Sequence, residues 1–208
     1  MALRTFVKVS AVNNLTDARY CAGMYVNLLG FSLEKDGKNF VSPEKHKEIT
    51  DWLSGLEYVA EFDKADGDTI SDALASYEGF SFIESERLEV LEQLSKKGYG
   101  LILRKEIKCE DDLDLSTAEL ETIQRLQIIL LLIGDDITIS EKAQKKIAGL
   151  SSKVEVLLGF GLEAEQIDKL LEATQVKGIA LHGGEEIRPG FKDFDELAEI
   201  LEALETED

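Results

Sequence analysis

The sequence contains few of the residues that build covalent or metal-bound scaffolds. Among its 208 residues are two cysteines, two histidines and two prolines. Cys21 and Cys109 are too few and too far apart for a disulfide framework or a metal site, so we expect two reduced thiols and no bound metal. We also expect no cofactor. These counts exclude the disulfide-rich and zinc-stabilised classes of small protein.

Long apolar runs and an excess of positive charge are lacking as well. The longest uninterrupted apolar stretch is IILLLI at 128–133, far shorter than a membrane span. The first ten residues lack the apolar run of a signal peptide. A formal net charge of −19 argues against nucleic acid or an anionic membrane as partner. We therefore expect a cytoplasmic protein, present as a monomer or a homodimer.

What the chain does have is a regular alternation of short apolar segments and longer helical patterns. Its 44% of hydrophobic residues suffice for a sizeable core. Strand-like segments lie at 5–12, 26–33, 58–62, 80–83, 100–107, 128–133, 154–160 and 178–183. Helix-like segments follow them at 14–24, 42–53, 69–77, 87–97, 116–126, 140–150, 164–174 and 193–204. Asn14 and the pair Ser42-Pro43 are helix-start signals.

This alternation predicts an α/β protein with parallel strands joined by crossover helices. Eight such units that close on themselves form a (β/α)8 TIM barrel, and we expect a single barrel domain over residues 1–208. A doubly wound open sheet is built from the same unit. Periodicity alone does not separate these two folds.

In a barrel of this kind, chemistry takes place where the strands end and the following loops begin. The polar residues and glycines at the predicted strand ends are Lys8, Ser10, Asn13, Lys35, Lys38, Asn39, Asp63, Glu84, Glu86, Arg104, Lys105, Gly134, Asp135, Asp136, the turn 159–162 and the turn 182–186. We expect the ligand-binding residues to come from this set.

The last two of these turns are rich in glycine, and each precedes a predicted helix. Turns after the seventh and eighth strands commonly hold a phosphate group in barrels. Glycine lets backbone N–H groups approach an anion closely. We therefore expect Gly161, Gly183 and Gly184 to present N–H groups to a phosphorylated or anionic small molecule. The alternative is a plain tight loop in a small barrel.

Five segments, in order along the chain, resemble motifs of one known enzyme family. KVSAVNNLTDA (8–18) is similar to KICGITNLEDA, YVNLLGF (25–31) to GADYLGF, and NFVSPE (39–44) to RYVSPE. GFGLEAEQI (159–167) is similar to AGGLNPENV, and ALHGGEEIRPGFKD (180–193) to DVSSGVESSPGVKD. The family that these motifs resemble is phosphoribosylanthranilate isomerase of tryptophan biosynthesis. The resemblance spans nearly the whole chain and implies the barrel fold. It also implies an Amadori rearrangement of a phosphoribosyl-amine.

The reacting groups that the resemblance implies are replaced. Ser10 stands where the family has its general base, a cysteine. A serine hydroxyl is a much weaker acid than a thiol and needs a positioned base beside it. Ile133 stands at or near the position of the family's general acid, an aspartate. Asp135 follows two residues later, so in a continuing strand it would point to the same face. Asp135 is thus a candidate general acid or, alternatively, a solvated loop residue or helix cap.

Several ligand-binding positions have also changed. The arginine of the family's RYVSPE motif is Asn39 here, with Lys38 beside it, and Phe160 replaces a glycine where its ring either fills the phosphate pocket or faces the core. The positions that match are Gly161, Gly184 and Glu186, and we add Lys8 and Gly183 to the predicted ligand-binding residues. Asp17 matches an acidic residue in the first helix of the family, and we expect it to be a helix cap or scaffold residue.

Of the two histidines, His182 is the candidate for a role in binding or catalysis. It lies at the predicted mouth, where it could bind a phosphate as an imidazolium, act as an acid or base, or hydrogen-bond within its loop. His46, within the charged run EKHKE, is expected on the surface.

Three functions follow from these residues. The first is a diverged relative of the isomerase that binds a phosphorylated or anionic small molecule at the barrel mouth. The second is an active isomerase whose acid and base have been reassigned to Ser10, Asp135 and His182. The third is a non-catalytic interaction protein.

Overall fold

The structure, a computed structural model, describes residues 2–37, 39–134, 139–183, 186–188, 191–192 and 195–206, with the side chains of 186–188, 191–192 and 195–196 outside that description. Eight parallel strands form a closed barrel in chain order. They are β1 (Phe6–Ser10), β2 (Leu28–Ser32), β3 (Glu57–Phe62), β4 (Phe80–Ser85), β5 (Gly100–Glu106), β6 (Ile129–Ile133), β7 (Val156–Gly159) and β8 (Gly178–His182). The predicted TIM barrel is confirmed, and the open sheet is excluded.

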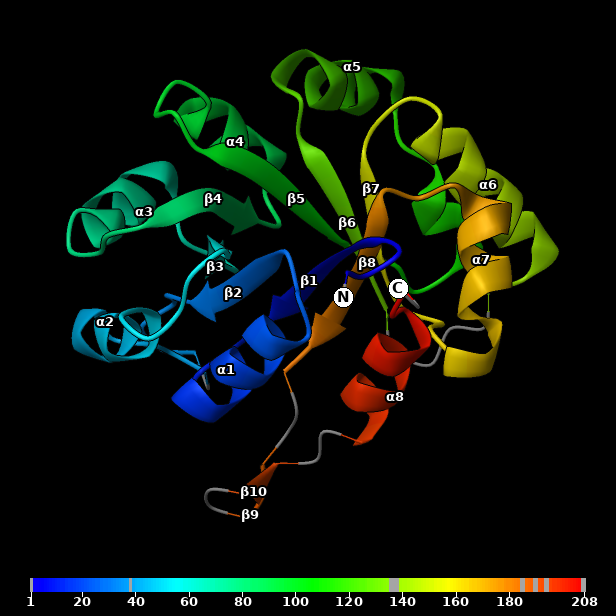
Figure 1. The fold of residues 1–208 in the computed structure, drawn as a ribbon. Coiled ribbons are helices and arrows are strands. Elements are labelled where there is room, and N and C mark those ends of the chain that lie inside the picture. Colours follow the sequence, from blue (N-terminus) through cyan, green and yellow to red (C-terminus); the bar gives the residue numbers. More distant parts are fainter. Residues whose placement is uncertain are drawn as a thin grey trace.

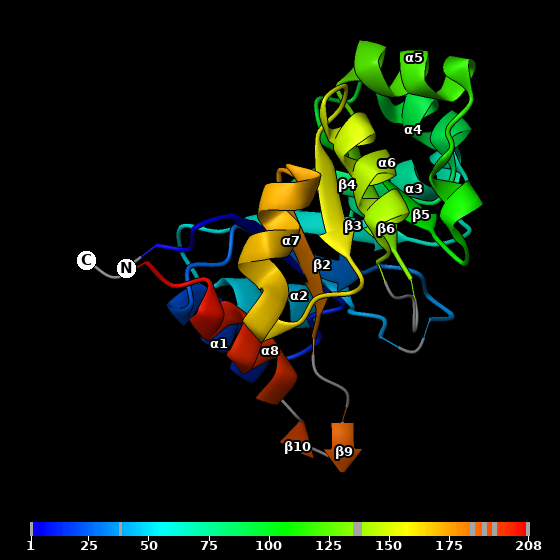
Figure 2. The same cartoon turned by 90° about the vertical axis from the view of Figure 1, so that its right-hand side faces the viewer.

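Closure depends on the pairing of the first and last strands. β1 pairs with β8 along its whole length, from Phe6 opposite Gly178 to Ser10 opposite His182. The two ends of the described chain also meet, since the Thr206 N–H donates to the Ala2 carbonyl at 3.0 Å. The labels for the two ends accordingly lie side by side in both views (Figure 1; Figure 2).

A helix follows each barrel strand, and the helices ring the barrel (Figure 1). They are α1 (Leu15–Gly23), α2 (Pro43–Thr50), α3 (Gly67–Leu74), α4 (Leu88–Leu94), α5 (Thr117–Leu126), α6 (Glu141–Ser151), α7 (Ile167–Thr174) and α8 (Asp195–Ala203). Short 3₁₀ turns, Glu110–Leu113 and Ala164–Gln166, precede α5 and α7. In the described part of the chain, no helix is long and apolar enough to cross a membrane.

The helices begin where side chains satisfy their first free N–H groups. The Asn14 side chain accepts from the Asp17 N–H, and Ser42 accepts from the Lys45 N–H with Pro43 in the first turn. Both predicted helix starts are confirmed. Asp17, whose identity suggested a cap or scaffold role, is buried in the first turn of α1.

Two apolar clusters hold the domain together. The larger lies between the barrel strands and the surrounding helices. The smaller fills the barrel interior and includes Leu28, Val59, Ile102, Leu131 and Leu157, each from a different strand. Because side chains alternate across a strand, polar residues on the inward parity of the same strands must occupy the barrel interior as well.

The expectation for His46 was wrong. Its side chain is 2% exposed. The imidazole is stacked on the Phe80 ring, with ring centroids 4.5 Å apart, and lies edge-on to Phe31 at 4.9 Å and to Tyr77 at 5.7 Å. Burial lowers its pKa from 6.5 to about 4. His46 and Ile49 lie three residues apart on one face of α2, and that face, rather than the charged one, packs on the barrel.

A second feature lies outside the predicted elements. Two short strands, β9 (Glu186–Arg188) and β10 (Phe191–Lys192), pair in antiparallel fashion between β8 and α8. This hairpin projects away from the barrel (Figure 1; Figure 2). Neither cysteine forms a disulfide; Cys21 is buried and Cys109 is exposed. The described residues contain no cluster of three potential metal ligands.

Candidate ligand-binding site at the barrel mouth

The structure brings several predicted site residues together at the carboxyl ends of the strands. Ser10 ends β1 and lies opposite His182, the last residue of β8. Asn39 follows β2, and its side-chain oxygen accepts from the Asn13 amide at 3.3 Å. Lys38, Asp135 and Gly184 lie outside the described residues, and so does the side chain of Glu186.

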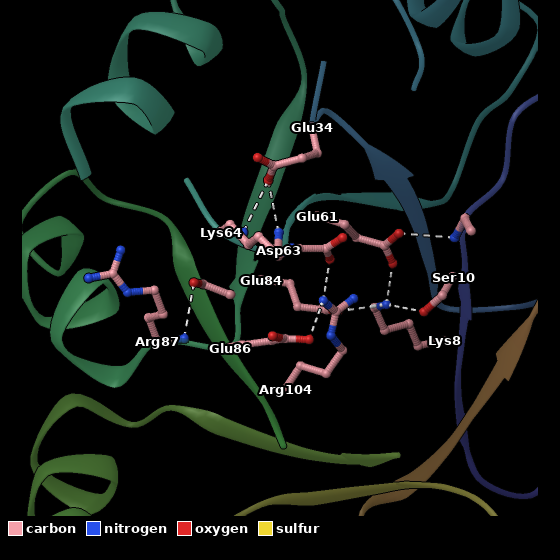
Figure 3. A network of polar contacts seen from close by, with 12 residues as sticks. Lys8, Ser10, Glu34, Glu61, Asp63, Lys64, Glu84, Glu86, Arg87 and Arg104 are labelled. Carbon is pink, nitrogen blue, oxygen red and sulfur yellow. Dashed lines mark hydrogen bonds and ion pairs between the residues drawn. The ribbon is translucent and has the colours of Figure 1, made fainter. Parts of the chain in front are cut away.

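Lys8 lies deeper than the sequence suggested. Its side chain is fully buried in the barrel interior, and its Nζ lies 2.5 Å from Glu61 Oε1, 2.8 Å from Glu84 Oε2 and 2.5 Å from Ser10 Oγ (Figure 3). An ammonium group has three donors and no acceptor. Lys8 donates hydrogen bonds to Glu61 and Ser10 and forms an ion pair with Glu84, so its fully buried ammonium group is engaged within the protein.

Glu61 bridges two elements of the barrel. Its second carboxylate oxygen accepts from the Ala11 N–H at 3.0 Å. Gly30 on β2 makes room for this carboxylate, because a Cβ at Gly30 would lie 1.8 Å from Glu61 Oε1. The glycine and the glutamate thus form one structural unit on neighbouring strands.

Arg104 of β5 extends the network toward the mouth. Its guanidinium pairs with buried Glu84 at 3.4 Å, with Glu86 at 2.9 Å and with Asp63. We call Lys8, Ser10, Glu61, Glu84 and Arg104 the charged network. Its two cations are matched by two buried carboxylates, and two more carboxylates surround Arg104 at the rim.

The electrostatics of the charged network keep Lys8 protonated. Burial alone would lower the pKa of Lys8, but the adjacent carboxylates of Glu61 and Glu84 outweigh it and raise that pKa above its ordinary value. Burial would raise the pKa of Glu61, yet the Lys8 charge and hydrogen bond hold it below its usual range. Burial dominates at Glu84 and raises its pKa despite the attraction of Lys8.

The opposite side of the mouth is different. A cavity of about 220 Å³ lies between the ends of β7 and β8 and the flank of α8. It is lined by Gly159, Phe160, Gly161, Leu162, Ala180, Leu181, His182, Leu197 and Ile200. We call it the β7–β8 cavity. Of these described lining residues, His182 alone is ionisable.

Two glycines shape the strand ends around this cavity. Gly161 has a φ of +63°, a left-handed conformation that glycine adopts readily. At the end of β7, a Cβ on Gly159 would lie 3.1 Å from the Leu132 carbonyl and 3.3 Å from Ile133. Backbone is therefore exposed to the cavity where side chains would otherwise crowd it.

The structure shows which of the predicted N–H groups are free at the cavity and where the Phe160 ring lies. The Gly183 N–H donates to the Ser10 carbonyl at 2.9 Å, so this N–H is engaged within the sheet rather than free for an anion. No backbone hydrogen bond among the described residues uses the Gly161 N–H. Phe160 is 5% exposed and belongs to the cluster between strands and helices, so its ring packs in the core while it lines the cavity.

Sequence reasoning missed Glu61 and the burial of Lys8. The strand pattern YVAEF held the signal, because Val59 faces the barrel interior and Glu61 shares its parity. An inward glutamate in a closed barrel needs a cation, and Lys8 has the same inward parity on β1.

Two curated proteins match nearly the whole length of the chain. No family model matches the chain. The N-(5'-phosphoribosyl)anthranilate isomerase of Gloeothece citriformis is 26% identical over 207 residues, covering 95% of this chain and 93% of that protein. The isomerase of the same name from Aquifex aeolicus is 25% identical over 97% of this chain and 98% of its own length.

A solved structure agrees. A phosphoribosylanthranilate isomerase in complex with reduced 1-(o-carboxyphenylamino)-1-deoxyribulose 5-phosphate superposes with a TM-score of 0.75 at 19% identity, over 96% of this chain and 98% of that one. This similarity supports the fold. In sequence and in fold, the chain is thus similar over nearly its whole length to phosphoribosylanthranilate isomerases.

Proposed function

We propose that the protein binds a phosphorylated small molecule at the carboxyl end of its barrel, with the phosphate in the β7–β8 cavity. The observation that carries this proposal is the cavity itself, which lies where barrels commonly hold phosphate. The related isomerase binds a ligand that carries a 5-phosphate. The N–H of Gly161 and the exposed imidazole of His182 are the groups at the cavity suited to an anion.

We expect an anion to bind only weakly, because the protein carries negative charge near this cavity and over its whole surface. Helix α8, whose Leu197 and Ile200 line the cavity, begins with Asp195 and Glu196. Negative charge in a first turn already complements the helix dipole and opposes a bound anion. The net charge of −19 acts in the same direction over a longer range. Lys38, Asn39, Gly184 and Glu186 are further proposed contacts.

The described mouth does not favour efficient isomerisation. Ser10 accepts a hydrogen bond from Lys8, a protonated group that cannot take the serine proton. Ser10 is therefore not activated as a base. The half-buried side chain of Ile133 occupies the end of β6, where the family resemblance places the general acid. A role for Asp135 as the acid stays a prediction.

Kinetics with phosphoribosylanthranilate separate the proposed function from an active isomerase. A general acid and a general base each contribute roughly 10²–10⁴-fold to a rate. We expect turnover to lie at least four orders of magnitude below that of a related isomerase, and a strain lacking that enzyme not to be rescued. Turnover near the typical enzyme median of ~10 s⁻¹ would show that the acid and base have been reassigned.

Ligand-dependent thermal stability tests the phosphate site. Ligand at about 100 times its dissociation constant stabilises the folded state by roughly 2.7 kcal/mol. We expect inorganic phosphate and ribose 5-phosphate both to raise the melting temperature. Gly161→Asp should abolish this effect by placing a carboxylate in the cavity.

Gly161→Asn is the matched control. Asparagine and aspartate have nearly the same shape, and both tolerate a left-handed backbone better than most residues. The neutral variant should retain most of the phosphate-dependent stabilisation. If the wild type shows no stabilisation by either anion, the phosphate site is vestigial and the interaction-protein function becomes the better explanation.

A further inference from the structure

The hydroxyl group of Ser10 has a direction that the charged network imposes. Lys8 Nζ donates hydrogen bonds to Glu61 and to Ser10, and it forms an ion pair with Glu84 at 2.8 Å. Since an ammonium can only donate, Ser10 Oγ must be the acceptor in its 2.5 Å contact with Lys8. The serine proton therefore points away from Lys8.

The Ser10 proton has no acceptor among the described residues. The Ser10 side chain is half-buried at the end of β1, with its Cα opposite that of His182. The nearby His182 Nδ1 lies 3.3 Å from the Gly183 carbonyl instead. The open direction for the serine hydroxyl is the barrel mouth, where β1 meets the β7–β8 side.

The contact with Lys8 also changes the strength of this donor. A hydroxyl that accepts from an ammonium is polarised, which makes it a better donor and a poorer base. Glu61 and Glu84 hold Lys8 in place, and the polarisation comes from the Lys8 N–H group in direct contact with Ser10 Oγ.

We propose that Ser10 positions a bound ligand by donating a hydrogen bond to one of its oxygen atoms, and that Lys8, held by Glu61 and Glu84, fixes the direction of that donor. This inference rests on the proposed function in that it requires a ligand at the mouth. The ligand class is a phosphorylated compound with an acceptor oxygen, such as a sugar hydroxyl or carbonyl, several bonds from its phosphate. Ser10 and Lys8 are a positioning pair rather than an acid–base pair.

Binding measurements with two probes test the role of Ser10. Calorimetric titration with ribose 5-phosphate and with inorganic phosphate should give different responses to Ser10→Ala. A single hydrogen bond corresponds to roughly a 3- to 10-fold change in affinity, so ribose 5-phosphate should bind that much more weakly. Inorganic phosphate, held in the β7–β8 cavity, should bind as it does to the wild type. Ser10→Thr, which keeps a hydroxyl, should restore most of the loss.

An unchanged affinity of Ser10→Ala for ribose 5-phosphate would overturn the proposal. An equal loss for both probes would overturn it too, because it would indicate a general disturbance of the mouth. If the wild type binds neither probe, the proposed function fails, and the donor direction must be measured without a ligand.

Neutron diffraction from a deuterated crystal of the wild type provides that measurement. We expect three deuterons on Lys8 Nζ, one of them directed at Ser10 Oγ, and the Ser10 deuteron directed into the mouth. A Ser10 deuteron directed at Lys8 or Glu61 would overturn the inference, whatever the binding experiments show.

Discussion

The two sides of the barrel mouth differ in how many charged groups they hold and in whether those groups are paired. On the β1–β5 side, the charged network pairs its charges internally, and Arg104 has three carboxylate partners, although Glu84 and the Arg104 Nε lack hydrogen bonds among the described residues. On the β7–β8 side, a cavity of about 220 Å³ is lined by glycines, apolar residues and one imidazole. A side whose charges are already paired cannot readily reorganise for a reaction, whereas an open side can accept a ligand. This contrast agrees with the proposed function, in which a ligand binds on the β7–β8 side.

This contrast predicts that the charged network is where single changes cost the most. Lys8→Met would leave Glu61 and Glu84 buried without their shared cation. Breaking a buried ion pair in this way typically costs about 3–5 kcal/mol. We expect a loss of that size in the free energy of unfolding measured with urea, or a failure to fold.

The triple variant Lys8→Met, Glu61→Gln, Glu84→Gln separates charge from shape. It removes all three charges while nearly preserving the side-chain volumes, and replacing a buried ionic cluster by neutral groups is often close to neutral in stability. We expect it to recover most of the loss. A single Lys8→Met variant as stable as the wild type would show that the network is not a folding requirement.

A second prediction concerns the outer surface of the same side, where His46 is buried between α2 and the barrel. The folded protein binds a proton at His46 only near pH 4, whereas an unfolded histidine does so near 6.5. The unfolded state therefore binds more protons between these values, and stability falls as the pH drops from 6.5 to 4. The expected loss is about 2–3 kcal/mol.

The matched variant is His46→Phe. Its ring can stack on Phe80 as the imidazole does, and it brings no titratable group. Urea midpoints measured at intervals between pH 7 and 4 should decline less in the variant than in the wild type. Identical pH profiles would mean that other groups, such as the Glu61 carboxylate, cause the acid sensitivity.

A third prediction compares a glycine from each side of the mouth. Gly30→Ala would place a Cβ against the Glu61 carboxylate, which Lys8 and the Ala11 N–H hold in place. Overpacking of this kind costs about 1–3 kcal/mol. Gly161→Ala should cost only about 1 kcal/mol, from its left-handed backbone.

Gly149 on the exposed face of α6 provides the control, since nothing lies within 4 Å of a Cβ placed there. Gly149→Ala should stabilise the protein by about 0.5–1 kcal/mol. A greater loss for Gly161→Ala than for Gly30→Ala would contradict the view that the β1–β5 side is the tightly packed one.

The fold was predictable because its signals are local. Alternating apolar segments and helix caps such as Asn14 and Ser42 depend on neighbouring residues, and they located all eight βα units. The β9–β10 hairpin was not found, because strands of three and two residues are too short for a periodic pattern. His46 was misplaced because its charged neighbours in sequence outweighed its apolar neighbours in space.

The site was only partly predictable for the same physical reason. The strand ends indicated Ser10 and His182, and the structure places them opposite each other. The pairing of Lys8 with Glu61 joins residues 53 positions apart and depends on the register of the barrel. Sequence patterns define which face a residue is on, but they do not define its partner on another strand.

The smallest predicted effect concerns the rim of the charged network. Glu84 and Glu86 both contact Arg104, but the Glu84 side chain is fully buried and that of Glu86 is 47% exposed. An exposed ion pair contributes about 0–1 kcal/mol, and salt screens it. Glu86→Gln should therefore lower the free energy of unfolding by less than about 1 kcal/mol, and by less still at 0.5 M salt, where the Debye length is only a few ångströms. It also removes one of the excess negative charges, which offsets part of the lost pair. A loss above 2 kcal/mol, unchanged by salt, would mean that Arg104 needs its rim partners to stay in place, and that the charged network extends to the surface of the mouth.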